Sequence, residues 1–133
     1  MNAPFLIRQP CPPGACACNR DQLLDTPGSD IRILRLTKEE EKKLVARLEQ
    51  LSSLSDLQHM QERIHALLGI TITITPGPNE VRTVRGLQIE IADQPGLCSK
   101  TRQTLPAAIR RGLERNPSIV YDLLNSHDLL GGL

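Results

Sequence analysis

The sequence predicts an α+β fold: a two-layer sandwich with a small antiparallel or mixed sheet, helices on one face, and an N-terminal arm rich in cysteine and proline. Two segments, 70–75 and 87–92, alternate isoleucine or leucine with polar residues, which is the period of half-buried strands. Amphipathic segments with helix-start patterns lie before and after them. Because each strand has one polar face, we expect the helices to cover only the other face.

The chain divides into an arm, residues 1–20, and a single α+β domain, residues 21–133. The 133 residues suffice to bury a sizeable core in one domain without disulfide support. Four prolines in the arm oppose helix formation. At the junction we expect one short helical turn at 20–25, then a turn, and then a strand at 31–36.

Two helices are expected before the first strand. Thr37 and Glu40 have the spacing of a capping box, and Ser55 and Gln58 repeat it. Each start is followed by an apolar stripe at helical spacing: Leu44, Val45, Leu48 and Leu51, then Leu57, Met60, Ile64, Leu67 and Leu68. Gly69 is placed to end the second helix, and the short connection between the helices predicts an antiparallel pair.

Between the strands, residues 76–86 read as a turn followed by an irregular strand. After the second strand, Thr104 is suited to cap a helix that has Pro106 in its first turn. A last helix is expected to start with Asn116 as its cap and Pro117 as its first residue.

The cysteines are the most unusual feature of the sequence. Cys11, Cys16 and Cys18 lie in the segment CPPGACAC, and Cys98 follows the second strand. Thiolates around a zinc or iron ion must come within about 3.8 Å of one another, because each Zn–S bond is near 2.3 Å. A Pro-Pro-Gly loop favours such convergence. The four cysteines are therefore a predicted metal site for zinc or an iron–sulfur cluster.

Two other interpretations of the cysteines stay open. Neighbouring thiols can serve in redox or disulfide exchange, and cysteines in an arm can also have no chemical role. The spacing matches neither a zinc ribbon nor the pattern of plant-type ferredoxins. A site made only of thiolates leaves no open position for water, which argues against hydrolytic zinc chemistry.

One stretch, residues 99–115, is locally basic. Its cations are Lys100, Arg102, Arg110, Arg111 and Arg115. Arg82 and Arg85 could extend this surface toward phosphates or an acidic partner. The alternative is an ordinary solvated helix face. Phe5 and Tyr121 are the only aromatic residues, so base stacking on aromatics is not expected.

The C-terminal segment offers a possible docking stripe. Its apolar residues are Ile119, Val120, Leu123 and Leu124, followed by Leu129, Leu130 and Leu133. This stripe either packs on the domain or docks a partner or a second copy. We expect the tail, 127–133, to fray. His59 and His65 are expected on the surface, and His127 in the frayed tail.

Composition excludes several functional classes. The charges nearly balance, with 16 basic and 15 acidic residues, and the sequence has neither a targeting segment nor an apolar run that could span a membrane. A cytoplasmic location is expected. No common catalytic motif is present, so an enzyme acting on a small-molecule substrate is not expected.

The sequence therefore predicts a small, non-catalytic metal-binding accessory or regulatory protein that acts through a protein or nucleic-acid partner. The first alternative is an iron–sulfur or dithiol redox protein. The second is a nucleic-acid-binding module that uses residues 99–115, with the cysteines incidental.

Overall fold

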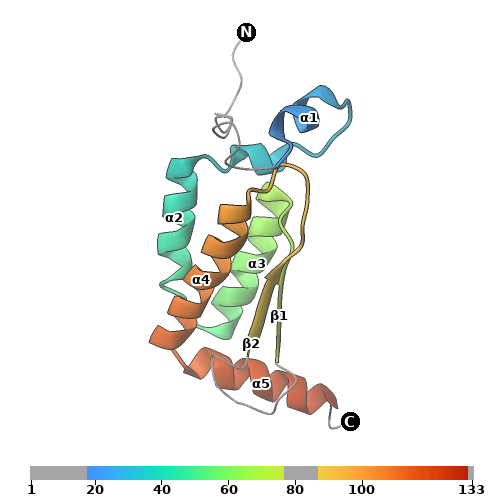
Figure 1. Cartoon of the computed structure of the whole chain (residues 1–133). Helices are drawn as coiled ribbons and strands as arrows, with labels where there is room; N and C mark the ends of the chain where they lie inside the picture. The colour runs from blue at the N-terminus through green and yellow to red at the C-terminus, as the bar shows by residue number, and fades with distance from the viewer. Residues whose placement is uncertain (1–17, 77–86, 132–133) are drawn as a thin grey trace.

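The structure is a computed structural model that describes residues 18–76 and 87–131. Within these ranges the elements are α1 (Arg20–Asp25), the 3₁₀ helix η1 (Arg32–Arg35), α2 (Lys38–Leu48), α3 (Leu54–Leu68), β1 (Ile72–Pro76), β2 (Leu87–Ile91), α4 (Ser99–Arg115) and α5 (Ser118–Gly131). The strands form an antiparallel sheet, α3 and α4 lie on one side of it, and α2 packs on α4 (Figure 1). The predicted α+β class is confirmed.

The register of the hairpin follows the alternation in the sequence. Ile72 pairs with Ile91 and Ile74 with Ile89, and all four side chains are buried. On the opposite face, Thr73, Gln88 and Glu90 are exposed. This confirms the two predicted strands and the one-sided cover of the sheet. The segment expected to connect them, 77–86, lies outside the described residues.

The strand predicted at 31–36 is wrong. This segment forms η1, with hydrogen bonds from the Leu34 N–H to the Ile31 carbonyl (3.0 Å) and from the Leu36 N–H to the Ile33 carbonyl (3.1 Å). Ile33 and Leu34 are both fully buried although they are adjacent. A strand would point them to opposite faces, whereas a helical turn directs both into the core.

The start of α2 was predicted correctly, but the start of α3 was not. Thr37 caps α2, and its hydroxyl accepts a hydrogen bond from the Glu40 N–H at 3.3 Å. The cap of α3 is Ser53, whose hydroxyl accepts from the Asp56 N–H at 3.0 Å, so the prediction at Ser55 was wrong. Gly69 ends α3 with a φ of 74°, as predicted.

Helix α4 begins five residues before the predicted cap at Thr104. The Thr104 hydroxyl donates to the Lys100 carbonyl at 2.7 Å within the helix, and Pro106 lies inside it. One proline inside a helix removes one hydrogen bond, here to the carbonyl of Arg102. Buried contacts of the first turns offset that loss: Thr101 is buried and donates to a Glu41 carboxylate oxygen at 2.5 Å.

Helix α5 begins at Ser118, next to the predicted start at Pro117, and the helical backbone continues to Gly131. The expected fraying of the tail is therefore wrong up to that residue. Ile119, Val120, Leu123 and Leu124 are buried in the domain core, so this part of the stripe packs on the domain. The side chains of Leu129, Leu130 and Leu133 lie outside the described part. None of the described helices has both the length and the apolar character needed to cross a membrane.

Candidate functional site

Cys18 is the first described residue of the chain and precedes Asn19, the N-cap residue of α1. Its side chain is buried. Its carbonyl oxygen accepts a hydrogen bond from the Gly96 N–H at 2.5 Å. The end of the arm is therefore attached to the loop that joins β2 to α4.

Gly96 makes this attachment possible by its lack of a side chain. A Cβ at this position would lie 2.7 Å from Ile33 Cγ2 and 2.8 Å from Leu23 Cδ2, and the φ of 86° disfavours any other residue. The loop thus packs directly on α1 and η1, and it carries the Gly96 N–H to the Cys18 carbonyl.

Cys98 follows Gly96 by two residues and is the N-cap residue of α4, where its side chain is half-buried. Two peptide units span at most about 7.6 Å between Cα atoms. The hydrogen bond from Gly96 therefore brings the backbone of Cys18 close to the segment that ends at Cys98. A helix N-terminus also stabilises anionic groups placed beside it.

The other two predicted ligands, Cys11 and Cys16, lie outside the described residues. Within 18–76 and 87–131 there is no group of three or more histidine, cysteine, aspartate or glutamate side chains that could hold a metal ion. The ligand set of Cys11, Cys16, Cys18 and Cys98 therefore stays a prediction.

The basic residues of α4 do not share one face of the helix. Lys100, Arg111 and Arg115 lie toward one side by helical geometry, and the Arg111 guanidinium forms an ion pair with Glu49 after α2. Arg102 and Arg110 lie on the β2 side. Arg102 Nη1 is 3.8 Å from Asp93 Oδ1, and Arg110 donates to the Leu87 carbonyl at 3.2 Å.

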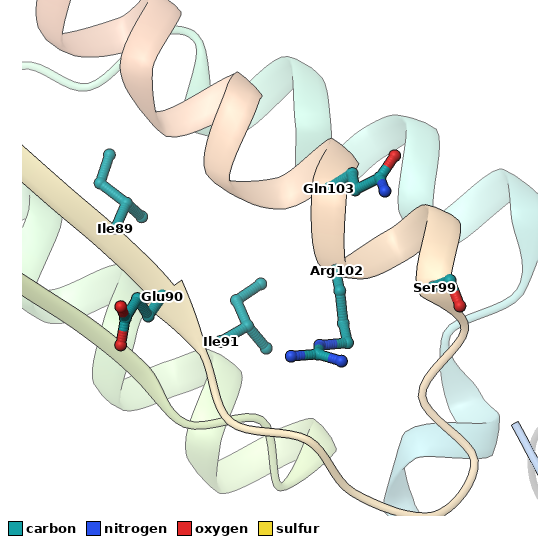
Figure 2. Close-up of a pocket in the computed structure, with 6 residues that line it drawn as sticks. All are labelled: Ile89, Glu90, Ile91, Ser99, Arg102 and Gln103. Atoms are coloured by element: carbon teal, nitrogen blue, oxygen red, sulfur yellow. The ribbon is translucent and has the colours of Figure 1, made fainter. Parts of the chain in front are cut away.

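A shallow groove of about 680 Å³ separates β2 from the first turns of α4. Figure 2 shows its lining residues: Ile89, Glu90, Ile91, Ser99, Arg102 and Gln103. Arg102 extends from α4 toward the end of β2 in this view. No pattern in the sequence indicates this groove, because alternation predicts a strand but not which helix lies beside its edge.

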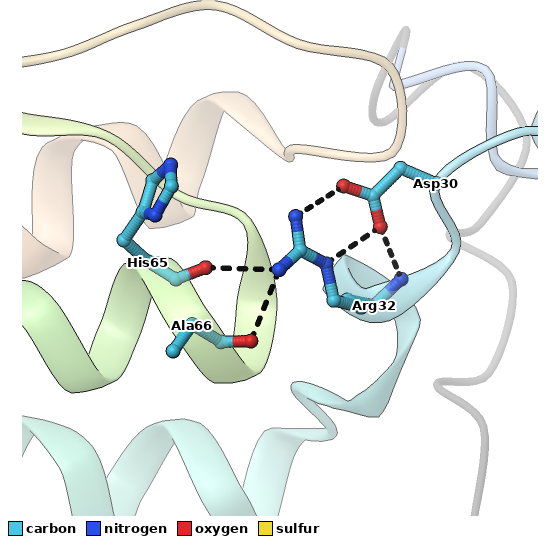
Figure 3. Close-up of polar contacts among 4 residues, drawn as sticks. All are labelled: Asp30, Arg32, His65 and Ala66. Carbon is cyan, nitrogen blue, oxygen red and sulfur yellow. Dashed lines mark hydrogen bonds and ion pairs between the residues drawn. The ribbon is translucent and has the colours of Figure 1, made fainter.

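A polar cluster at the end of α3 also escaped the sequence analysis (Figure 3). Arg32 Nη1 donates to the carbonyls of His65 (3.3 Å) and Ala66 (3.0 Å). Asp30 accepts from the Arg32 side chain at 2.9 and 2.7 Å and from its N–H at 3.1 Å. These bonds to the Arg32 guanidinium, and then to its N–H, lower the pKa of Asp30 from 3.8 to about 2.

The geometry gives this cluster a structural role. Arg32 satisfies carbonyls at the C-terminus of α3 that have no partner within the helix, and Asp30 holds its guanidinium in place. The side chains of His59 and His65 are exposed, as predicted. His127 belongs to the residues whose side chains are not described.

No protein-family model matches the chain, and no curated protein or solved structure matches it either. What the protein does must therefore be inferred from its own residues. Two regions are candidates for a functional site: the cysteines around the loop 92–98, and the groove beside β2.

Proposed function

We propose that this chain is a small, non-catalytic metal-binding accessory or regulatory protein, in which Cys11, Cys16, Cys18 and Cys98 hold zinc or an iron–sulfur cluster. The observation that carries the proposal is the 2.5 Å hydrogen bond between the Gly96 N–H and the Cys18 carbonyl. It joins the end of the cysteine-rich arm to the loop that leads into Cys98.

The chemistry of the four side chains supports this assignment. Thiolates are ligands for zinc and for cluster iron, and three of them come from one short loop. Four thiolates complete a tetrahedral zinc site and leave no position for a reacting water. The bound metal would therefore hold the arm on the domain rather than catalyse a reaction.

Metal binding of this kind is coupled to folding. The arm, residues 1–20, contributes three of the four proposed ligands, so each metal–thiolate bond also fixes the arm against loop 92–98. Loss of the metal would release the arm while the core of the domain stays folded. In the reducing cytoplasm, where we place the protein, the cysteines would remain thiols that can bind metal.

A protein partner fits this proposal better than nucleic acid does. Arg111 and Arg102 each face a carboxylate, of Glu49 and Asp93, and the cations of α4 lie on two sides of the helix. Among the residues that the structure describes, this distribution offers no continuous basic strip for a phosphate backbone.

The test is elemental analysis with an absorption spectrum of anaerobically purified protein, for the natural sequence and for single Cys→Ser variants at each of the four positions. We expect one zinc per chain without visible absorbance, or iron with a thiolate charge-transfer band, and loss of the metal in each variant. His59→Gln is the control and should retain the metal, because this exposed imidazole is not a proposed ligand.

Hydrogen exchange at the Gly96 amide provides a second readout. Cys11 is seven residues before Cys18, the residue to which the Gly96 amide is hydrogen-bonded. If the metal holds the arm in place, Cys11→Ser should nevertheless speed hydrogen exchange at the Gly96 amide. A metal-free protein that also binds no zinc or iron on reconstitution would overturn the proposal. A reversible thiol titre in such a protein would favour the dithiol redox alternative instead.

A further inference from the structure

The outer edge of β2 is open among the described residues. The Ala92 N–H donates to the Thr71 carbonyl at 3.1 Å, which fixes the hydrogen-bonding phase of the hairpin. In an antiparallel pair this phase alternates along the strand. The main-chain groups of Gln88 and Glu90 therefore face β1, and those of Leu87, Ile89 and Ile91 point away from it.

The outer edge of β1 is protected differently. The Gln61 side chain of α3 donates to the Ile72 carbonyl at 3.0 Å, and Pro76 has no N–H to offer. On β2, Arg110 binds the Leu87 carbonyl. No main-chain partner on the outer side is present for Ile89 or Ile91 within the described ranges, and both residues line the groove beside α4 (Figure 2).

The distance between two arginines of α4 matches the length of this edge of β2. Arg102 lines the groove with Ile91, and Arg110 contacts Leu87, so α4 runs antiparallel to β2. Eight helical residues separate the arginines, a rise of about 12 Å at 1.5 Å per residue. Leu87 and Ile91 are four residues apart, about 13 Å at 3.3 Å per residue.

We propose that the edge of β2 binds an extended acidic segment of a partner protein as a third strand, with two carboxylates four residues apart that face Arg102 and Arg110. Residues four apart in a strand lie on the same face. The residue midway between them also faces α4, beside the buried Ile89, and should be apolar and β-branched. This inference names a partner surface for the proposed accessory role, but it does not depend on the metal.

Different contacts would supply the affinity and the selectivity of this binding. Main-chain hydrogen bonds to Ile89 and Ile91 would supply affinity for any extended segment, whereas the two arginines would select for carboxylates at the right spacing. Replacing the ion pair between Arg102 and Asp93 by one with the partner should cost little free energy. The two groups are 3.8 Å apart, and their side chains are 44% and 78% exposed, so the existing pair is weak. By strand alternation the Glu90 side chain lies on the exposed face of β2, opposite to Ile89 and Ile91, where it disfavours acidic residues on the same face of the added strand.

The test uses two blocked heptapeptides of identical composition. The matched peptide is Thr-Glu-Thr-Val-Thr-Glu-Thr, with its glutamates four residues apart on one face. The shifted peptide is Thr-Glu-Thr-Val-Glu-Thr-Thr, with its glutamates on opposite faces. Titration at low ionic strength, followed by amide chemical shifts, should show tighter binding of the matched peptide by about two- to fivefold, with the largest changes at Ile89 and Ile91.

Variants identify the contact. Arg102→Gln should abolish the preference for the matched peptide. Lys100→Gln removes the same charge two residues away, on another side of the helix, and should preserve the preference. Equal affinity of the natural protein for both peptides, or binding of neither, overturns the proposal and leaves the metal analysis unaffected.

Amide hydrogen exchange of the protein without peptide checks independently whether the edge of β2 is open. The amides of Ile89 and Ile91 should exchange quickly without peptide and slowly with the matched peptide. Protection in the chain alone would mean that the edge is already covered, and it would also overturn the proposal. The mass in solution would then show whether a second copy or the chain's own terminal residues provide the cover.

Discussion

Gly112 of α4 lies directly against the main-chain carbonyl of Leu48 in α2: a Cβ at position 112 would be 2.2 Å from that oxygen. No side-chain rotation can relieve such a contact, because both atoms belong to backbone or are fixed to it. The crossing of α2 and α4 therefore depends on this glycine. It holds α4 at the distance at which Thr101 meets Glu41 and Arg111 meets Glu49.

Gly112→Ala is expected to destabilise the domain by about 1–3 kcal/mol, since α2 and α4 must move apart and their buried contacts loosen. Helix propensity alone would instead make the alanine variant more stable by roughly 1 kcal/mol. Ala46→Gly, at an exposed position of α2, calibrates that propensity term. Urea unfolding measures both variants, and a Gly112→Ala protein as stable as the natural one would contradict the close crossing.

Asp56 joins the end of α2 to the start of α3. Its carboxylate accepts from the Ser52 N–H at 3.0 Å and forms an ion pair with Arg47, and Asp56 is only 13% exposed. The hydrogen bond from Arg47 is the main cause of its lowered pKa. Asp56→Ala should cost about 1–2 kcal/mol, a range that allows for screening of the 43%-exposed Arg47.

A double-mutant cycle of Asp56→Ala with Arg47→Ala, measured by urea unfolding, isolates the pair. We expect a coupling energy of at least about 0.5 kcal/mol. The pair of Arg20 and Asp21 is the comparison, because the Asp21 carboxylate is 82% exposed, and Asp21→Ala should cost less than about 0.5 kcal/mol. Similar costs at both aspartates would show that the Asp56 contacts add nothing.

Asp30 should make the stability depend on pH in acid. Its pKa is lowered from 3.8 to about 2 in the folded chain, so unfolding takes up a proton between these values. The stabilisation is present above pH 4 and is lost as the pH falls from about 4 to 2. Asp30→Asn should show a shallower loss of the urea midpoint over this interval. Parallel pH profiles for the two proteins would rule out the Asp30 contribution.

Sequence patterns predicted the helices and strands that depend on residues close together in the chain. The isoleucines of β1 and β2 alternate in sequence and are buried in the structure, and the Thr37 cap bonds to a residue three positions away. The predictions failed where distant residues decide the outcome. Thr104 and Pro106 form a plausible helix start, yet α4 begins at Ser99, where Thr101 meets Glu41 from 60 residues away.

The same distinction between local and distant causes applies to the candidate site. The sequence suggests Cys98 as a fourth ligand because it follows a strand and a Pro-Gly turn, and this ligand set stays a prediction. The hydrogen bond between Gly96 and Cys18 lies two residues from Cys98. The groove beside β2 depends on which edge α3 protects through Gln61, and no local pattern carries that information. Likewise, helical periodicity places Arg102 and Arg111 on opposite sides of α4, but only the packing of the helix shows that Arg111 faces Glu49 and Arg102 faces Asp93.

The hydroxyl of Thr101 should stabilise the first turn of α4, and with it the position of Cys98. Thr101 is buried and donates to Glu41 at 2.5 Å, so Thr101→Val leaves that carboxylate without its donor while it keeps the shape of the side chain. We expect a loss of about 1–2 kcal/mol in urea unfolding. Amide exchange in 99–103 should also speed up, as should the reaction of Cys98 with a thiol reagent in a Cys11→Ser/Cys16→Ser/Cys18→Ser background.

Thr104→Val is the matched control for this prediction. It makes the same substitution one turn later in α4, where the hydroxyl bonds only to the Lys100 carbonyl of its own helix. Because that carbonyl stays within the helical hydrogen-bond network, the cost should be below about 0.5 kcal/mol, with Cys98 reactivity unchanged. If both variants changed Cys98 reactivity equally, the effect would follow from the loss of any threonine hydroxyl in α4, because valine and threonine have similar helix propensities. The contact between α2 and α4 would then not control the loop that bears the cysteine.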